Sequence, residues 1–396
     1  MMFANAESAP ESFTYMESYV RERLAAGLTP HQLLLSFNVS SSVQEEFALG
    51  ARGGADEAVV LSALLVRWVS RVQDVDLSRE LVRAAIDGDA EAVGELLHAG
   101  APWDALDDRG HSAGSHAVAR GHVHAYKLLI DSGARAVLRE ENKGGGAGGH
   151  FCGENERYLT QVLHFEESRI LDAERRPVMM EWETQLMRAH ADLLCAPSAT
   201  HRQAANFESA SGGEMRAAAD RDVLNIGFGL GLIDRMLQEA RPRSHTIVEA
   251  HPDILAVMQQ EGWGKRPGVR VLAGKWQDEL PPLCERSKRG EGPPFDSIFF
   301  DTFAEGIDEL RRFHALLPDL LRPGGVYSFF NGIAAHDAFL HGVFCEALRR
   351  ELLALGFRRV DFVPVSVVHP KPHVWEGTSL RHWWHFDQYQ MPACYR

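Results

Sequence analysis

The sequence predicts an all-helical N-terminal region followed by an α/β domain with a doubly wound, mostly parallel sheet. Three observations in its 396 residues predict this organisation. From residue 151 onward, short apolar runs alternate with helical stretches, as in a parallel sheet with crossover helices. Residues 79–135 repeat with a period of 33 residues. A glycine-rich run at 143–150 separates the two patterns, because it favours neither helix nor strand.

The composition is that of a globular chain and argues against several classes of function. Acidic residues outnumber basic ones by 55 to 41, so the net charge is −14. We therefore expect no direct nucleic-acid binding, because phosphates require a basic surface. The apolar stretches are too short for a membrane span, and the first residues lack a secretory signal pattern. Five scattered cysteines without a CxxC pair predict a reducing compartment, no disulfide framework and no metal site.

The N-terminal region carries a repeat. Residues 1–75 have helical spacing of apolar positions, and we expect a helical cap or a degenerate repeat there. The repeat follows in residues 76–140, and residues 141–150 are expected to be a linker. The matched positions are Gly88 and Gly121, Leu96 and Leu129, Leu97 and Ile130, and Gly100 and Gly133. This pattern resembles ankyrin repeats, in which each helical pair buries one face against its neighbour.

The region 151–396 reads as an alternation of strands and helices. The expected strands are residues 222–226, 246–249, 269–273, 295–301, 326–330, 357–364 and 381–389. The expected helices are residues 230–239, 252–260, 309–321 and 339–355. We expect the turn at 321–325 to end the third of these helices, because it contains Pro and Gly. The carboxyl ends of parallel strands meet at one edge, where α/β sheets bind ligands.

Two features follow the first two strands of this domain. The sequence Gly227-Phe228-Gly229-Leu230-Gly231 comes directly after the first strand, and glycine allows a sharp turn close to a ligand. Glu249 ends the second strand, where a carboxylate can accept hydrogen bonds from both ribose hydroxyls. The glycine pattern by itself fits any dinucleotide or nucleoside site. A nicotinamide site would normally have Gly or Ala where this chain has Leu232.

Two further features favour an S-adenosylmethionine methyltransferase. Gly274-Lys275-Trp276 follows the third strand, and Asp301 ends the fourth. Glycine, glutamate, aromatic residue and aspartate after successive strands are the usual layout of that class, so we expect a Rossmann-like class I methyltransferase domain. The turn Arg322-Pro-Gly-Gly325 before another strand agrees with this interpretation.

Six motifs together carry a more specific resemblance. They are VMMEWET at 178–184, GFGLG at 227–231, GKW at 274–276, FDSIFFDTF at 295–303, LRPGGV at 321–326 and FFNG at 329–332. Residues 150–396 thereby resemble guanidinoacetate methyltransferase. With the repeat at 79–135, the chain resembles still more the arginine N-methyltransferase 2 family, which joins ankyrin repeats to such a domain. That family methylates the internal (delta) nitrogen of arginine in proteins.

The resemblance implies a role for particular residues around S-adenosyl-L-methionine. The residues implied at its methionine part and ribose are Gly227, Phe228, Gly229, Leu230, Gly231, Leu232, Glu249, Ala250 and His251. Lys275 and Trp276 would flank the adenine, and Tyr158 and Met187 would close over the cofactor. Glu183 and Asp301 match the two carboxylates that grip the guanidine.

The chemistry of guanidinium agrees with two carboxylates. Guanidinium is a planar fork of N–H donors that pairs bidentately with carboxylates, and it has no free lone pair at neutral pH. A carboxylate beside one nitrogen can orient it and take its proton as the methyl bond forms. We therefore expect Asp301 to be base and orienter, and Glu183 to be second clamp and charge partner. Asn331, after a strand at the same edge, is expected to touch the substrate.

The catalytic domain leaves the acceptor open. An ankyrin array offers a concave surface suited to proteins, which favours a protein substrate docked on the repeats. The resemblance suggests ribosomal proteins, in the cytoplasm or nucleus. A methyltransferase for a small guanidino compound such as guanidinoacetate, with an accessory repeat domain, is the second hypothesis. A non-catalytic scaffold is the third, and the intact glycine loop, Glu249 and Asp301 argue against it.

Overall fold

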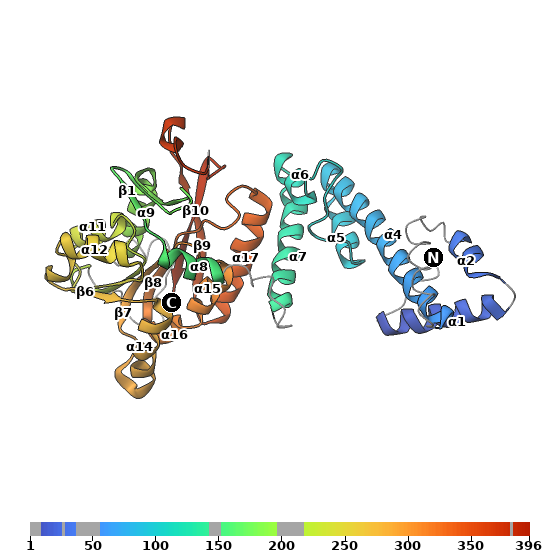
Figure 1. The fold of residues 1–396 in the computed structure, drawn as a ribbon, viewed down its shortest axis with the longest axis horizontal. Helices are drawn as coiled ribbons and strands as arrows, with labels where there is room; N and C mark the ends of the chain where they lie inside the picture. Colours follow the sequence, from blue (N-terminus) through green and yellow to red (C-terminus); the bar gives the residue numbers. More distant parts are fainter. Residues whose placement is uncertain (1–8, 26–27, 37–55, 142–151, 196–217, 381–382) are drawn as a thin grey trace. The chain divides into compact units, whose positions relative to one another are not determined.

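The computed structural model describes residues 9–25, 28–36, 56–141, 152–195, 218–380 and 383–396. The chain divides into two compact units, Met1–Ser132 and Gly133–Arg396 (Figure 1). The division falls inside helix α7 (Val123–Glu141). The expected linker at 141–150 begins at the last residue of this helix, and its residues 142–150 lie outside the described residues.

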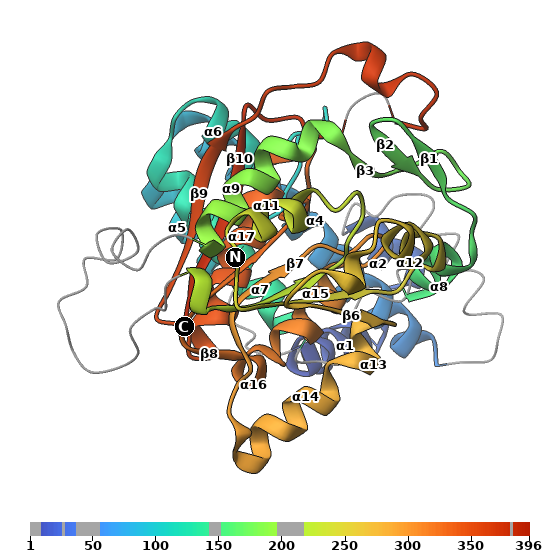
Figure 2. The same ribbon diagram turned by 90° about the vertical axis from the view of Figure 1, so that its left-hand side faces the viewer.

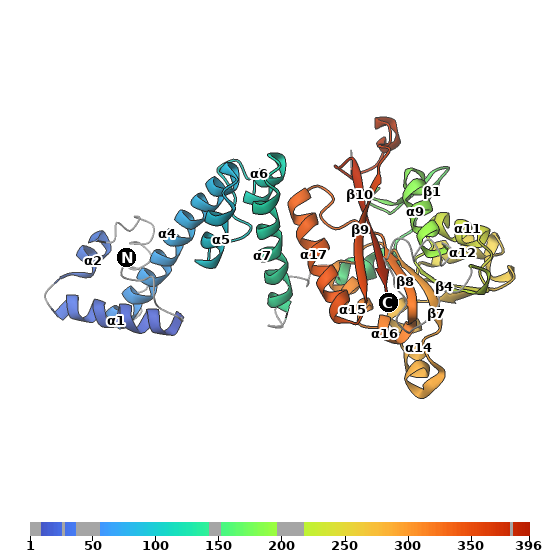
Figure 3. The same ribbon diagram turned by 180° about the vertical axis from the view of Figure 1, so that it is seen from behind.

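The first unit consists of helices and the loops between them, with one isolated β-bridge from Leu106 to Ser112. Its helices are α1 (Ala9–Ala25), α2 (Pro30–Ser36), α4 (Glu57–Asp87), α5 (Ala90–His98), α6 (Ala113–Ala119) and the start of α7. Helix α4 lies beside α1, as Figures 1 and 3 both show. Together with α2 they form a core of Met16, Val20, Leu33, Leu34, Ala58, Leu61, Leu64 and Leu65. Helix α4 continues through residue 75 without a break, so the division expected there falls within one helix.

The 33-residue period corresponds to a repeated turn before a helix. Gly88 and Gly121 have φ values of 76° and 74°, and each lies two residues before the helix that follows it, α5 or α7. This left-handed backbone conformation strongly favours glycine, which explains why the sequence repeats glycine here. Between α5 and α6, the carboxylate of Asp107 accepts the backbone N–H groups of Arg109 and His111 and so holds the loop.

The second unit contains a seven-stranded sheet with the order β6-β5-β4-β7-β8-β10-β9. Its strands are β4 (Asp222–Ile226), β5 (Ser244–Glu249), β6 (Val269–Ala273), β7 (Phe295–Phe300), β8 (Leu321–Phe329), β9 (Arg359–Ser366) and β10 (Gln388–Tyr395). Strands β4 to β8 are parallel, whereas β10 is antiparallel to both β8 and β9. Figure 3 shows β9 and β10 side by side. The chain order reverses beside β4, so the sheet is doubly wound.

Several expected boundaries are wrong. The helix expected at 309–321 is two helices, α15 (Ile307–His314) and α16 (Leu317–Leu320), with Pro318 in the first turn of the second. Proline lacks a backbone N–H and clashes with the preceding turn, so one continuous helix cannot pass through it. Residues 321–325 are not a separate turn, because β8 begins at Leu321. The last strand begins at Gln388, later than the expected residue 381.

Residues 151–221 have no expected elements, and the described residues 152–195 line one side of the edge of the sheet. They form α8 (Cys152–Thr160), a small antiparallel sheet of β1 (His164–Glu166), β2 (Arg169–Leu171) and β3 (Pro177–Met180), and α9 (Thr184–Cys195). Short helical turns are η2 (Glu181–Glu183), η3 (Ala218–Asp220), η4 (Trp263–Lys265), η5 (Ser287–Glu291) and η6 (Pro372–Trp375). None of the described helices is long and apolar enough to cross a membrane.

Helices cover both faces of the large sheet. On one face, α9 and α11 (Leu232–Glu239) lie together and pack on β4, β7 and β8, with α12 (Pro252–Gln260) on β5 (Figure 2). On the other face lie α13 (Trp276–Glu279), α14 (Pro281–Arg286), α15, α16 and α17 (Ala338–Ala354). Side chains alternate along β4, so Val223 faces the first group and Leu224 and Ile226 face the second.

Candidate active site

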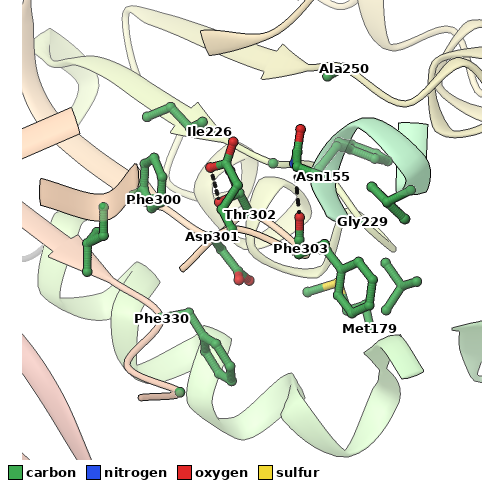
Figure 4. Close-up of a pocket in the computed structure, with 18 of the residues that line it drawn as sticks. Asn155, Met179, Ile226, Gly229, Ala250, Phe300, Asp301, Thr302, Phe303 and Phe330 are labelled. Carbon is green, nitrogen blue, oxygen red and sulfur yellow. Dashed lines mark hydrogen bonds between the residues drawn. The ribbon is translucent and has the colours of Figure 1, made fainter. Parts of the chain in front are cut away.

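A cavity of about 660 Å³ lies at the carboxyl ends of β4, β5 and β7. Its further walls come from α8, from β3 with η2, and from the connection between β9 and β10. Figure 4 shows this cavity with Asp301, Gly229, Met179 and Phe330 around it. This is the edge at which open α/β sheets bind their ligands, and the crossover beside β4 opens it.

The glycine loop after β4 forms the floor of the cavity, and its glycine positions have no space for a side chain. Gly227 has a φ of 91°, and a Cβ atom there would lie 1.8 Å from the carbonyl oxygen of Asp301. Its N–H donates to the carbonyl of Val248 over 2.9 Å, which fixes the loop to β5. A side chain at 227 would therefore push β7 away from β4. The close packing leaves the loop backbone exposed to a ligand.

Glu249 is the last residue of β5 and lines the cavity, although it is only 7% exposed. One carboxylate oxygen accepts the N–H of Phe228 over 2.9 Å, and the other accepts the N–H of His251 over 2.7 Å. Burial raises the pKa of Glu249, and these backbone donors oppose that shift. The carboxylate is thus held in one orientation, as a group that binds ribose hydroxyls requires.

A third wall of the cavity follows β6. The indole N–H of Trp276 donates to Glu305 over 2.9 Å, and the side-chain amide of Gln277 donates to the same carboxylate over 2.9 Å. The other end of that amide, Gln277 Oε1, is buried and has no partner among the described residues. Lys275 also lines the cavity, with its Nζ 3.8 Å from Glu156.

These groups fit S-adenosylmethionine. The unpaired acceptor Gln277 Oε1 matches the exocyclic amino group of an adenine, which is a donor. The oriented Glu249 matches a ribose diol, and the bare backbone of the glycine loop leaves room for the amino-acid part. Sequence reasoning missed Gln277 and Glu305. Their signal was position, since Gln277 directly follows Trp276 and Glu305 lies four residues after Asp301.

Two carboxyl groups occupy the remaining part of the cavity. Asp301 directly follows β7, and Glu183 ends η2. Glu183 is oriented locally, because its Oε1 accepts the N–H of Met180 over 2.8 Å, the back-hydrogen bond of a capping box. The Asp301 carboxylate, by contrast, accepts no hydrogen bond from any residue that the structure describes.

Both of these carboxyl groups have raised pKa values. Burial and the buried carboxyl of Asp234 raise the pKa of Asp301 to about 7. Burial and repulsion from Asp301 raise the pKa of Glu183 to about 8, which the Met180 N–H partly opposes. Desolvation and a neighbouring negative charge both disfavour the ionised form. Such a pair gains most from a ligand that brings positive charge.

The structure brings together most of the residues that the sequence indicated. Those that line the cavity are Tyr158, Glu183, Gly227, Phe228, Gly229, Glu249, Ala250, Lys275, Trp276 and Asp301. The others do not line it. Leu230, Gly231 and Leu232 lead from the loop into α11, with Gly231 as its N-cap.

Three further residues expected at the site do not line the cavity. Met187 is fully buried in α9, where it packs against β4 and β7 rather than over a ligand. His251 caps α12 and bonds through its ring to the carbonyl of Tyr158 over 3.1 Å, behind the cavity wall. Asn331 is 1% exposed, and its amide donates to the carbonyl of Gln390 over 3.0 Å. Each side chain points into the protein, which spacing along the chain could not show.

Outside this cavity, one described cluster offers metal-ligand atoms. Asp107, His111 and His116 present such atoms within 4.8 Å of one another in the helical unit. The Asp107 carboxylate already accepts two backbone N–H groups, and its other oxygen lies 2.8 Å from His116 Nε2. These contacts account for the cluster as a support of the loop.

The fold and the cavity define the class of protein. Three features together are those of a class I S-adenosylmethionine-dependent methyltransferase. They are the sheet of five parallel strands with an antiparallel pair at one edge, the glycine loop after β4, and the acid at the end of β5. The family model named guanidinoacetate N-methyltransferase matches residues 164–371.

Relatives define the family more narrowly. "Protein arginine N-methyltransferase 2" of Aspergillus oryzae is 31% identical over 344 residues, which is 76% of each chain. The proteins of the same name from Aspergillus fumigatus and Yarrowia lipolytica are 30% and 36% identical, over 79% and 60% of this chain and 78% and 46% of theirs. This chain belongs to the protein arginine N-methyltransferase 2 family. It is a methyltransferase whose cofactor is S-adenosyl-L-methionine.

Proposed function

We propose that this enzyme methylates the internal (delta) nitrogen of an arginine residue in a protein. The observation that carries the proposal is the pair Glu183 and Asp301, two carboxyl groups with raised pKa values beside the glycine loop. The names of the relatives, which are protein arginine methyltransferases, support the acceptor class. The delta position follows from how the two carboxyl groups would bind the guanidinium ion.

The carboxyl pair suits a guanidinium ion. With pKa values of about 7 and 8, the pair holds one or two protons at neutral pH in the absence of an acceptor. An arriving arginine is always charged and lowers both pKa values, so both groups ionise and pair with its N–H fork. If Glu183 pairs with the terminal nitrogens and Asp301 lies beside the internal N–H, the internal nitrogen is the one that faces the methyl donor next to a base.

The residues of this chain then orient the acceptor and manage one proton. When bound, S-adenosylmethionine supplies an activated methyl group on a positively charged sulfur. The glycine loop, Glu249 and Gln277 would hold it. Asp301 fixes the plane of the guanidinium and accepts the proton that its nitrogen loses on methylation. Glu183 balances the remaining positive charge. Positioning of the two reactants supplies much of the acceleration.

The charges around the cavity favour a peptide over a small guanidino acid. The cationic side chains among its described lining residues are Arg176 and Lys275. Arg176 bonds to Asp172 over 2.7 Å, and Lys275 lies 3.8 Å from Glu156. Guanidinoacetate carries its own carboxylate, and of these two cations Arg176 is already bonded, which leaves Lys275 as its partner. An arginine within a chain has neutral carbonyl groups instead and does not need a free cation.

The helical unit has a place in this proposal. Its 33-residue period and its repeated turns support ankyrin-type repeats, which would dock the substrate protein through their concave surface. A ribosomal protein in the cytoplasm or nucleus is the substrate we propose to test first. Small-guanidine methylation is the alternative, and in it the helical unit would be accessory.

One experiment tests the proposal. The purified chain is incubated with labelled S-adenosylmethionine and either ribosomal proteins, a protein extract or guanidinoacetate. We expect label on protein, with fragmentation of the released methylarginine placing the methyl group on the internal nitrogen. Removal of residues 1–150 should abolish protein labelling. Label on guanidinoacetate alone, unchanged by that truncation, would replace the proposal by the alternative.

A further inference from the structure

The part of the cavity next to Glu183 has an aromatic wall that the proposed chemistry does not use. It consists of Trp182, Phe330, Trp375 and Trp383. The ring of Trp182 lies between two other indoles, with centroids 6.3 Å from Trp375 and 6.4 Å from Trp383. Phe330 and Trp383 are stacked, with centroids 5.6 Å apart and planes 15° from parallel. Figure 4 shows the Phe330 ring on the side of the cavity that the Asp301 carboxylate faces.

Segments far apart in the chain assemble this wall. Trp182 comes from η2, Phe330 follows β8, and the two other indoles come from the connection between β9 and β10. Two arginines of the small sheet hold that connection. Arg169 donates to the carbonyls of Val374 and Glu376 over 2.6 and 2.9 Å, and Arg175 donates to the carbonyl of Gly377 over 2.7 Å. The wall is therefore a built feature and not a chance gathering of apolar side chains.

A close approach fixes Trp383 within the wall. A Cβ atom on Gly332 would lie 2.8 Å from Cζ2 of the Trp383 ring. Only glycine at 332 leaves the indole this space. The neighbouring Trp384 is buried and does not line the cavity; its ring packs against His341, Tyr389 and Trp383 itself. The two adjacent tryptophans thus form a natural pair of test residue and control.

The wall and the carboxyl pair are complementary to different parts of one guanidinium ion. Carboxylates pair with its N–H edge, whereas the electron-rich face of an indole attracts the flat face of the ion. Trp182 and Glu183 are adjacent in the chain, so one turn presents both kinds of group to the cavity. The indole N–H of Trp182 is buried and has no partner among the described residues, which leaves a donor beside the acceptor site.

We propose that the wall formed by Trp182, Phe330, Trp375 and Trp383 is the specificity site for arginine in a peptide chain. The indoles stack on the guanidinium face and the aliphatic stem, and the Trp182 N–H donates to a carbonyl oxygen of the substrate backbone. The inference rests on the function proposed above. It adds how the enzyme distinguishes a peptide arginine from a free guanidine, which the carboxyl pair does not do.

The test compares two ligands of the full-length enzyme by calorimetry in the presence of S-adenosylhomocysteine. N-acetyl-arginine N-methylamide has the guanidinium, the stem and two carbonyls, whereas n-butylguanidine lacks the carbonyls. We expect Trp383→Leu to weaken binding of both ligands by about tenfold, since a desolvated cation–π contact is lost. Trp182→Leu should weaken n-butylguanidine by about tenfold and the arginine amide by roughly fiftyfold, since the amide also loses the N–H. Trp182→Phe keeps a ring but loses the N–H, and should weaken only the arginine amide, by about fivefold for one lost hydrogen bond.

Controls separate recognition from folding. Trp384→Phe should leave the affinity for both ligands unchanged, and every variant should bind S-adenosylhomocysteine as the wild type does. Gly332→Ala, which displaces Trp383 without removing a ring, should weaken both ligands like Trp383→Leu. If the wild type and the two Leu variants bound the arginine amide with equal affinity, the proposed role of the aromatic wall would be wrong. A wild type that binds S-adenosylhomocysteine but neither guanidine would overturn the proposed function, and this inference with it.

Discussion

Glu249 and Asp301 both line the cavity at the carboxyl end of a parallel strand, but the protein treats their carboxyl groups in opposite ways. Backbone N–H groups of Phe228 and His251 meet both oxygens of Glu249, so its geometry is set before a ligand arrives. Burial and the carboxyl group of Asp234 raise the pKa of Asp301 to about 7, and Asp301 in turn helps to raise that of Glu183. Hydrogen bonds thus fix the cofactor end of the cavity at Glu249. At the acceptor end, formed by Glu183 and Asp301, the carboxyl groups repel each other, and a bound cation relieves that repulsion.

The two parts of the cavity therefore differ in how they contribute to the stability of the ligand-free protein. A fully bonded carboxylate binds a neutral diol without changing its ionisation state. A carboxyl pair with few hydrogen bonds destabilises the ligand-free protein, and a bound guanidinium ion relieves this repulsion. The affinity of the site therefore depends on the positive charge of the ligand.

The largest effect is expected from Asp301→Asn. Asparagine cannot accept a proton at catalytic pH, so we expect the methylation rate to fall by roughly 10³-fold, within the usual range for a lost general base. The affinity for S-adenosylhomocysteine should be retained, because Glu249 and Gln277 are untouched. Single-turnover methylation and calorimetry give the two readouts. A variant with near wild-type turnover would remove Asp301 from the chemistry.

Gly227→Ala should disrupt cofactor binding at the glycine loop. The added Cβ would meet the carbonyl oxygen of Asp301 at 1.8 Å, and the φ of 91° is unfavourable for alanine. We expect cofactor affinity to fall by about 100-fold or more, since the loop must move to relieve the overlap. The change Gly262→Ala is a control with a similar φ of 72° and no neighbour within 4 Å. Equal cofactor affinity in the two variants would show that the overlap does not matter.

The pH dependence distinguishes the two ends. Acceptor binding requires ionised Glu183 and Asp301, so its affinity should rise with pH and level off above about 8, the higher of the two pKa values. Below pH 7 we expect roughly a tenfold change per pH unit, or more where both protons must leave. S-adenosylhomocysteine affinity should change far less over pH 7–9. A flat acceptor profile would contradict the raised pKa values.

Glu183→Gln should stabilise the fold of the ligand-free enzyme. Between the usual carboxyl pKa and about 8, folded Glu183 holds a proton that the unfolded chain has lost, so its contribution to stability falls as pH rises. Glutamine does not ionise, so the variant should not lose this stability as the pH rises. We expect about 1–3 kcal/mol of stabilisation at pH 9 and almost none at pH 4.5, discounted for partial solvent access. Chemical unfolding at the two pH values measures the difference, and equal changes at both would refute this cause.

The smallest effect is expected from Met187→Leu. Met187 is buried in the core under β4 and β7 and does not reach the cavity, so a swap of similar volume should cost less than about 1.5 kcal/mol of stability. The affinity for S-adenosylhomocysteine should be unchanged. A loss of affinity without a loss of stability would restore Met187 as a residue of the cofactor site.

The sequence located much of the site because strand order and strand ends are encoded locally. Each of the parallel strands β4, β5 and β7 is a short apolar run, and a functional residue directly follows or ends it. Parallel strands bring these ends to one edge, so the sequence alone is enough to place Gly227, Glu249 and Asp301 together. The glycine period of the helical unit was visible for the same local reason.

Other positions depend on facts that spacing does not contain. Whether Met187 faces a ligand or the core depends on the rotation of α9 against the sheet. Asn331 turns toward β10 because a strand almost sixty residues later supplies its partner, the carbonyl of Gln390. Pro318 shows the opposite case, since its effect on the helix was local and could have been predicted.

The sequence by itself thus determined the sheet, the glycine loop and the two acids that follow β5 and β7, because covalent order and residue type decide them. Only the tertiary structure decided the chemistry of the acceptor end. The pKa of Glu183 depends on burial and on Asp301, which lies more than a hundred residues away along the chain. The aromatic wall joins Trp182 to Trp375 through contacts that no local pattern reports. Electrostatic interaction and packing act through space, and folding alone sets those distances.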